Sequence, residues 1–116
     1  KLVLGNLEAI RDWGYAPDYV QAMWKMLQQD TPHDFVIATG IGHTIREFCQ
    51  LAFERVGLDY RDFVSFDPKF YRPVEEVPLI GDATRAAADL NWSPEVSFKE
   101  LVHLMVDADI EQIESI

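Results

Sequence analysis

Apolar residues recur at helical spacing in four stretches of the chain. In the first, Pro17 suits the first position of a helix, and the apolar side chains after it fall on one face: Val20, Met23, Trp24 and Leu27. The second opens with Thr44 and Glu47 at capping-box spacing, and Gly57 stands where a helix-ending glycine belongs. Its expected apolar stripe is Ile45, Phe48, Cys49, Ala52, Phe53 and Val56. Two amphipathic helices are predicted.

Two further helices follow toward the end of the chain. The third is short, with Asp82 as its N-cap and alanine-rich residues up to about Leu90. The fourth starts at a second capping box, formed by Ser97 and Glu100. Its inward face is expected to hold Phe98, Leu101, Val102, Met105 and Ala108.

The strand candidates are short. Residues 2–4, 35–38 and 63–66 are rich in apolar and aromatic side chains, and residues 35–38 give the strongest pattern. Three prolines between residues 67 and 78 exclude a regular central strand there, so an ordered loop or edge is expected. The chain is therefore a mixed α/β protein, rich in helix, with too few strands to close its own sheet. A missing half is expected, and the opening residues are those of a strand cut from something longer.

Composition narrows the classes of partner. The length of 116 residues fits one domain, and the apolar share of 48% is that of a globular protein. The net charge is −10 and no run of Lys or Arg exists, which argues against nucleic acid as a partner. Against that background, any anionic ligand must be held by a few well-placed arginines.

The single cysteine allows no internal disulfide, and no apolar run reaches the ~20 residues that span a bilayer. A cytoplasmic protein without a membrane partner is expected.

Several patterns of chemical interest favour structural roles. Gly40 and Gly42 lie between a predicted strand and a helix, but Ile45 stands at the third glycine position of a dinucleotide-binding loop. A strand-to-helix turn is therefore expected. The histidines His33, His43 and His103 lack metal-ligand spacing, so no metal site is expected. Cys49 falls on an apolar helix face, which indicates a core thiol.

Two arginines are better candidates. Arg11 lies in a loop that follows a glycine and precedes a helix, and its rigid fork of five donors suits phosphate oxygens. The alternative is local pairing with Glu8 or Asp12. Arg72 stands among aromatic residues and prolines, a setting that suits a diphosphate and a ribose, with Glu75 as an acceptor for ribose hydroxyls. The alternative is a surface arginine among acids.

The order of these segments resembles the GDP-mannose 4,6-dehydratase family, within the extended short-chain dehydrogenase/reductase superfamily. The resemblance rests on LGNLEAIRDWG at 4–14, DYV at 18–20, MW at 23–24, MLQ at 26–28, VIATG at 36–40 and HTIREF at 43–48. It continues through YRP at 71–73, Glu75, GD at 81–82 and LNWSP at 90–94, and so covers nearly the whole chain. The last segment occurs in some form in many nucleotide-sugar epimerases and dehydratases.

The resemblance implies an enzyme of two parts. An N-terminal Rossmann domain binds NADP, and a C-terminal part binds GDP-mannose, which becomes GDP-4-keto-6-deoxymannose on the way to GDP-fucose and other GDP-deoxyhexoses. The family's catalytic Thr, Glu, Tyr and Lys lie upstream of the matched region, and this chain has no Tyr-x-x-x-Lys or Gly-x-x-Gly-x-x-Gly. Residues 1–116 are thus expected to be one substrate-binding region, without catalytic, cofactor or metal residues, which lacks its Rossmann domain and is inactive alone. The complete enzyme is expected to be a homo-oligomer.

The resemblance carries four substrate-binding residues to this chain. Arg11 and Arg72 match the arginines that hold the diphosphate, Glu75 matches the acid near the ribose, and Asn6 falls in the matched string beside them. Val74 and Val77 replace the family's common Thr and Asp, so the resemblance supports diphosphate binding more than guanine recognition.

Two other hypotheses stay open at this point. The chain could belong to a related NAD(P)-dependent epimerase or reductase that acts on another nucleotide sugar. It could also be a non-enzymatic helical interaction module, although the family order of the two arginine segments argues against this. The residues upstream of Lys1 would separate the first alternative from the dehydratase.

Overall fold

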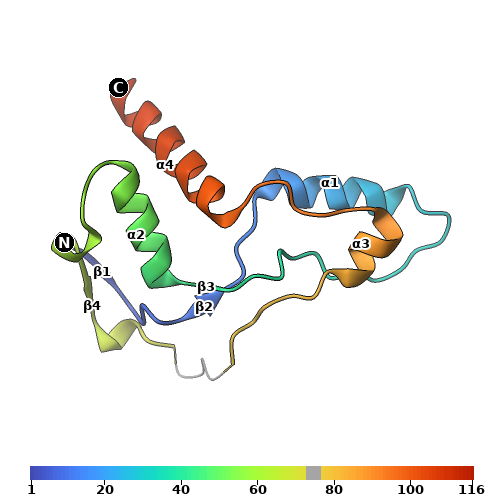
Figure 1. Ribbon diagram of the computed structural model, residues 1–116, viewed down its shortest axis with the longest axis horizontal. Coiled ribbons are helices and arrows are strands. Elements are labelled where there is room, and N and C mark those ends of the chain that lie inside the picture. Colours follow the sequence, from blue (N-terminus) through green and yellow to red (C-terminus); the bar gives the residue numbers. More distant parts are fainter. Residues whose placement is uncertain (73–76) are drawn as a thin grey trace.

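The computed structural model describes residues 1–72 and 77–116 (Figure 1). Within these ranges the elements follow one another along the chain. They are β1 (Leu2–Leu4), β2 (Ile10–Arg11), α1 (Ala16–Leu27), β3 (His43–Thr44), α2 (Ile45–Arg55), β4 (Val64–Phe66), α3 (Thr84–Leu90) and α4 (Phe98–Glu114). Short 3-10 turns at Tyr60–Asp62 and Pro68–Phe70 flank β4. The expected mixed α/β, helix-rich class is confirmed.

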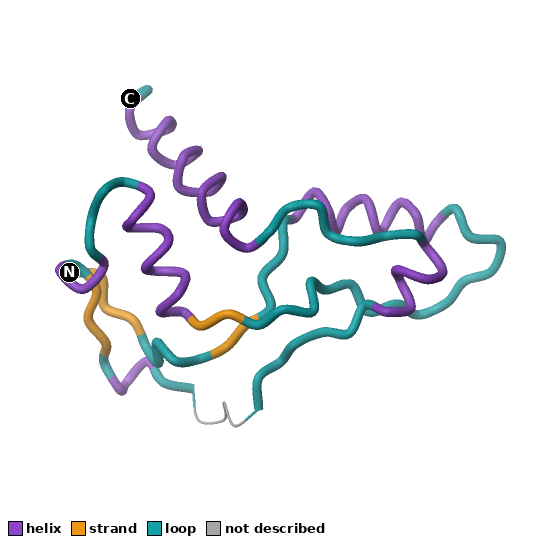
Figure 2. Tube along the Cα trace, in the orientation of Figure 1, coloured by secondary structure: helices purple, strands orange, loops and turns teal. Residues whose placement is uncertain are grey.

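The strands form two separate two-stranded sheets (Figure 2). β1 and β4 pair in parallel, with Leu2 opposite Val64 and Leu4 opposite Phe66, so two of the three predicted strands are confirmed. β2 and β3 pair antiparallel, with Arg11 opposite His43, and this small sheet was not predicted. Two-residue strands carry too little periodicity to be recognised in a sequence.

The strand predicted at residues 35–38 is wrong. This segment has no regular secondary structure, because a strand is defined by its hydrogen-bonding neighbour and none pairs with it in the described part of the chain. Most of its apolar side chains are nevertheless at least partly buried. Phe35 and Ile37 pack against the core around Trp92, whereas Val36 is 55% exposed. The apolar run therefore contributes to the core, but no neighbouring strand in the described part of the chain pairs with its backbone.

Helix α1 forms where it was predicted, with Pro17 in its first turn, but its large apolar residues face outward. The exposed face of α1, as we call it, consists of Val20, Met23, Trp24 and Leu27, which are 61%, 58%, 61% and 82% exposed. The opposite side packs on α3 through Ala22 and Ala86, both fully buried. Two small side chains allow the helices to approach closely.

Helices α2 and α4 form the second packed unit. The Thr44–Glu47 capping box forms at the start of α2, and Gly57 follows its end with φ of +76°, as its predicted role requires. Arg55 of α2 and Asp107 of α4 form a bidentate ion pair at 2.7 and 2.9 Å. Of the stripe predicted for α2, Cys49 is buried, whereas Val56 is 43% exposed.

The ends of α3 and α4 differ in detail from the predictions. Asp82 bonds the N–H of Thr84, although the cap position itself falls on Ala83, and α3 ends at Leu90 as predicted. At the start of α4 the Ser97 hydroxyl accepts from the N–H of Glu100.

The inward face predicted for α4 is correct only in its first turns. Leu101 and Val102 are buried, whereas Met105 is 51% exposed and Ala108 is also exposed. The reason is that the last turns of α4 extend away from the rest of the protein (Figure 1).

The molecule is flat and open for its size. It measures 53 × 40 × 19 Å, and its radius of gyration is 17.0 Å, where a compact chain of this length gives about 13 Å. Its accessible surface is 8367 Å², against about 6,500 Å² for a compact protein of 13.3 kDa. Much apolar surface therefore lies uncovered, as the sequence predicted. Among the described residues, no helix is both long and apolar enough to cross a bilayer.

Candidate functional site

One cleft contains three of the four predicted site residues. It has a volume of about 390 Å³ and lies between the β1–β2 loop, the start of α2 and the segment after β4. Its lining consists of Gly5, Asn6, Arg11, Asp12, Trp13, Ile45, Phe70 and Arg72. The structure thus brings Arg11 and Arg72 together although they are 61 positions apart in the sequence. Glu75, the fourth predicted residue, and Val74 lie outside the described residues.

Arg11 lies at the centre of a three-segment arrangement. On one side its backbone pairs with His43 of β3, and on the other it forms a parallel bridge with Leu79. Its guanidinium Nη1 donates to the carbonyl of Ile10 at 2.9 Å. Glu8, one local partner expected for it in the alternative interpretation, forms an ion pair with Arg46 at 2.6 Å.

Asn6 and Gly5 shape the opposite wall of the cleft. The side-chain oxygen of Asn6 accepts from the N–H of Glu8 at 3.0 Å, which fixes the turn that leads into β2. A Cβ on Gly5 would lie 2.7 Å from the carbonyl oxygen of Phe70. Only glycine therefore lets the segment that carries Arg72 approach the β1–β2 loop so closely.

Asp12 is the residue that the sequence analysis missed as a contributor to this site. One carboxylate oxygen accepts from the N–H and the hydroxyl of Thr39, at 3.1 and 2.5 Å. The other accepts from the N–H groups of Gly40 and Gly81, at 3.0 and 3.1 Å. Partial burial acts to raise the pKa of Asp12, but the bonds from Thr39, Gly40 and Gly81 together bring it below its ordinary value.

Two glycines make this arrangement possible. Gly40 has φ of +78°, a conformation that side chains other than glycine rarely adopt. A Cβ on Gly81 would lie 2.3 Å from the Cβ of Ala38. The segment around Gly40 and Gly42 therefore serves as a connection into β3 and α2, in agreement with the turn predicted for it, although residues 35–38 before it do not form the expected strand.

An aromatic cluster borders the cleft on the side of Trp13. The Trp13 ring lies 5.3 Å from that of Phe48 and 5.6 Å from that of Phe98, centroid to centroid. His43 stacks on Phe98 at 3.9 Å, and its Nδ1 lies 2.8 Å from a carboxylate oxygen of Glu47. The cluster fixes α4 against α2 and gives the cleft a rigid wall.

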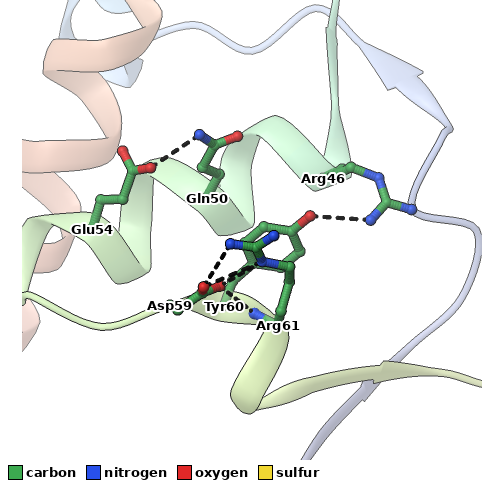
Figure 3. Close-up of polar contacts among 6 residues, drawn as sticks. All are labelled: Arg46, Gln50, Glu54, Asp59, Tyr60 and Arg61. Atoms are coloured by element: carbon green, nitrogen blue, oxygen red, sulfur yellow. Dashed lines mark hydrogen bonds and ion pairs between the residues drawn. The ribbon is translucent and has the colours of Figure 1, made fainter.

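A second cleft, of about 410 Å³, lies beside α2 and the turn after it. Figure 3 shows that its polar side chains bind one another. Arg61 pairs with Asp59 at 2.8 Å, Gln50 donates to Glu54 at 2.9 Å, and Arg46 donates to the hydroxyl of Tyr60 at 3.1 Å. These contacts are exposed and mostly local in sequence, and they indicate a structural role for this surface.

Cys49 is a core thiol, as predicted, since it is buried and burial raises its pKa. Within residues 1–72 and 77–116 no cluster of three or more His, Cys, Asp and Glu side chains is arranged to hold a metal ion.

Solved structures share this fold over nearly the whole chain. UDP-glucose 4-epimerase from Thermotoga maritima, determined with UDP-glucose, matches 97% of this chain and 36% of its own, with a TM-score of 0.84 and 28% identity. dTDP-glucose 4,6-dehydratase from Bacillus anthracis, determined with NAD, matches 92% of this chain and 33% of its own, with a TM-score of 0.79 and 19% identity. The fold is that of the C-terminal part of a Rossmann-type enzyme of the extended short-chain dehydrogenase/reductase class.

Sequence comparison resolves the family within that class. A model of the family "GDP-mannose 4,6 dehydratase" matches residues 1–105, and the chain belongs to this family. GDP-mannose 4,6 dehydratase 2 of Arabidopsis thaliana is 52% identical over 111 residues, which are 96% of this chain and 30% of the relative. The human GDP-mannose 4,6 dehydratase is 48% identical, over 93% of this chain and 34% of its own. The chain thus spans about a third of the length of these relatives, and the predicted resemblance is confirmed.

Proposed function

We propose that the chain is the substrate-binding part of a GDP-mannose 4,6-dehydratase, a lyase that converts GDP-mannose to GDP-4-keto-6-deoxymannose. One observation carries the proposal: Arg11 and Arg72, the two arginines that match the family's diphosphate-binding positions, line the same cleft. Neither position is near the other in the sequence, so the fold has brought them together.

The chemistry of the cleft suits a diphosphate. Two guanidinium groups present planar forks of donors, which bind phosphate oxygens in pairs and retain their charge at all physiological pH values. They do so in a chain of net charge −10, whose overall field repels anions. Asn6 adds a side-chain amide to the same cleft. In this proposal Glu75 accepts hydrogen bonds from the ribose.

The residues of this chain do not fit a nicotinamide cofactor. The sequence holds neither a Gly-x-x-Gly-x-x-Gly loop nor a Tyr-x-x-x-Lys pair. We therefore assign NADP, together with the catalytic Thr, Glu, Tyr and Lys, to an N-terminal Rossmann domain of the same enzyme. In the reaction, the role of this chain is to bind GDP-mannose and to orient it toward that domain.

Surface features of the chain support docking of such a domain. The exposed face of α1 presents Trp24 and its neighbours to solvent, and Val36 lies in a segment without regular secondary structure or a strand partner among the described residues. A helix with an apolar outer face beside an unpaired apolar segment fits the margin of an α/β sheet. The proposal places the missing sheet against these two elements. It also places the complete enzyme in the cytoplasm, as a homo-oligomer on the route to GDP-fucose.

Substrate selectivity tests the proposal. The complete enzyme that carries this chain is incubated with NADP and, in separate reactions, with GDP-mannose, UDP-glucose and dTDP-glucose. The 4-keto-6-deoxy product is expected from GDP-mannose alone. Epimerisation of UDP-glucose, or dehydration of dTDP-glucose with no reaction of GDP-mannose, would overturn the proposal in favour of a related nucleotide-sugar enzyme.

A further inference from the structure

The carboxylate of Asp12 connects three segments that are far apart in the sequence. Its partners Thr39 and Gly40 are 27 and 28 residues away, and Gly81 is 69 residues away. All four donors are directed at one side chain, and three of them are backbone N–H groups. A carboxylate bound in this way fixes the relative positions of the three backbones, because each bond to a charged acceptor is stronger than a neutral one.

These three segments are the same ones that position Arg11. Arg11 pairs with His43, which follows the Gly40 turn, and with Leu79, which precedes Gly81. Asp12 comes directly after Arg11 in the sequence. It accepts hydrogen bonds from Gly40 of one flanking segment and from Gly81 of the other, just beyond the residues that pair with Arg11. The pairing on each side of Arg11 is very short, so it needs a contact of this kind to hold its register.

We propose that Asp12 is a positioning residue: its carboxylate holds the backbone of Arg11 between β3 and Leu79 and thereby sets the affinity of the cleft for a diphosphate. The inference rests on the proposed function, since Arg11 must contact the diphosphate for its position to matter. Asp12 itself is a negatively charged acceptor in the lining of the cleft and repels a diphosphate. Its contribution is therefore made through Arg11 and not by contact with the ligand.

The Asp12→Asn variant of the complete enzyme tests the proposal. An asparagine at this position has one acceptor oxygen and presents an NH2 group to donors that need an acceptor. The KM for GDP-mannose is expected to rise about threefold to tenfold, with kcat changed less than twofold, because a misplaced Arg11 weakens the binding of substrate and transition state alike. An unchanged KM would overturn the proposal.

A double-mutant cycle separates positioning from a general structural role. In an Arg11→Ala background, adding Asp12→Asn is expected not to weaken the binding of GDP further, because the group on which Asp12 acts is gone and a negative charge is removed from the cleft. If Asp12→Asn weakens binding by the same factor with and without Arg11, the proposal is overturned. If Arg11→Ala alone leaves GDP binding unchanged, the proposed site fails, and the inference with it. Loss of binding in Arg11→Ala but not in Asp12→Asn overturns the inference alone.

Asp18 provides the matched control. Its buried carboxylate also connects distant segments, since it accepts from the N–H groups of Glu95 and Val96 at 3.1 and 3.2 Å, but it lies outside the cleft. Asp18→Asn is expected to lower the melting temperature and to leave the KM unchanged. A rise in KM equal to that of Asp12→Asn would show that loss of stability alone explains the effect, and would overturn the proposal.

Variants of Thr39 provide a second test of the proposal if the Asp12→Asn enzyme fails to fold. Thr39→Val removes the hydroxyl donor to Asp12, whereas Thr39→Ser retains it. The valine variant is expected to show the rise in KM, and the serine variant is expected to restore the wild-type value. Equal KM values for the two variants would overturn the proposal.

Discussion

The indole N–H of Trp92 donates a 2.8 Å hydrogen bond to the backbone carbonyl of Asp18, 74 residues earlier in the chain, and both residues are buried. Trp92 is also the largest side chain in the core cluster that joins α1 to α3. One side of α1 is thus fixed by both a polar and an apolar contact. This explains why the other side, with its larger apolar residues, faces outward.

Trp92→Phe is expected to destabilise the protein. The phenyl ring retains much of the packing. The buried carbonyl of Asp18 loses its hydrogen-bond donor, and a small cavity forms beside it. The free energy of unfolding should fall by about 2 kcal/mol. Urea denaturation of the complete enzyme, followed by circular dichroism, measures the change. Trp24→Phe, at a side chain outside the core cluster that contains Trp92, controls for the loss of an indole ring and should have a smaller effect. Equal effects would contradict the account.

Acid should remove the stabilising contribution of Asp12. The pKa of its carboxyl lies below the ordinary value of 3.8 because the hydrogen bonds that it accepts outweigh its partial burial. A folded-state pKa that is lowered makes the contribution fully present above about pH 4, and the contribution is lost as the pH falls through the folded value. The difference in melting temperature between wild type and Asp12→Asn should therefore narrow below about pH 4. A difference that stays constant from about pH 7 to pH 2 would contradict this assignment.

The exposed face of α1 should bind apolar molecules non-specifically in the isolated chain and should be buried in the complete enzyme. Trp24→Glu is expected to reduce the binding of a hydrophobic dye to the isolated chain, which we expect to be prone to aggregation. The same change should lower the melting temperature of the complete enzyme, because a carboxylate would be buried without a partner. Trp24→Phe should retain both properties. A complete enzyme that tolerates Trp24→Glu without loss of stability would contradict docking at this face.

The isolated chain should show no dehydratase activity. The sequence has neither a Gly-x-x-Gly-x-x-Gly loop nor a Tyr-x-x-x-Lys pair, the elements by which we propose that the complete enzyme binds and orients NADP, so the isolated chain is expected to hold no hydride acceptor. Incubation with NADP and GDP-mannose, followed by chromatography for the 4-keto product, provides the measurement. Product formed above the rate without protein would contradict the assignment of catalysis to another part of the enzyme.

The sequence was sufficient for features that depend on local chemistry. Helix starts such as the Thr44–Glu47 capping box and the end of α2 at Gly57 both follow from side chains close to one another in the chain. The family strings also identified Arg11 and Arg72, which the fold then places in one cleft.

Features that depend on distant partners could not be predicted in the same way. Residues 35–38 have the apolar, β-branched composition of a strand but no strand partner in the described part of the chain. The spacing of the large apolar residues in α1 does not indicate which side of the helix packs on α3, because the close contact is made by alanines. Asp12 was considered only as a local partner of Arg11, since its donors at Thr39, Gly40 and Gly81 are brought to it by the fold.

The most direct test of the account is the affinity of the complete enzyme for GDP when each cleft arginine is removed. A charge-assisted hydrogen bond contributes about 1.5–3 kcal/mol, and about 1.4 kcal/mol is one decade in Kd. Isothermal titration with Arg11→Ala and with Arg72→Ala should therefore show Kd values for GDP raised tenfold or more. Arg72→Lys should recover only part of the loss, because an ammonium group lacks the planar fork.

In parallel titrations, the two alanine substitutions should raise the Kd for mannose 1-phosphate, which has no diphosphate, less than the Kd for GDP-mannose. NADP binding should be unchanged in both alanine variants. Wild-type Kd values for GDP in both variants, accompanied by lower melting temperatures, would show that Arg11 and Arg72 hold loops together and do not bind the diphosphate.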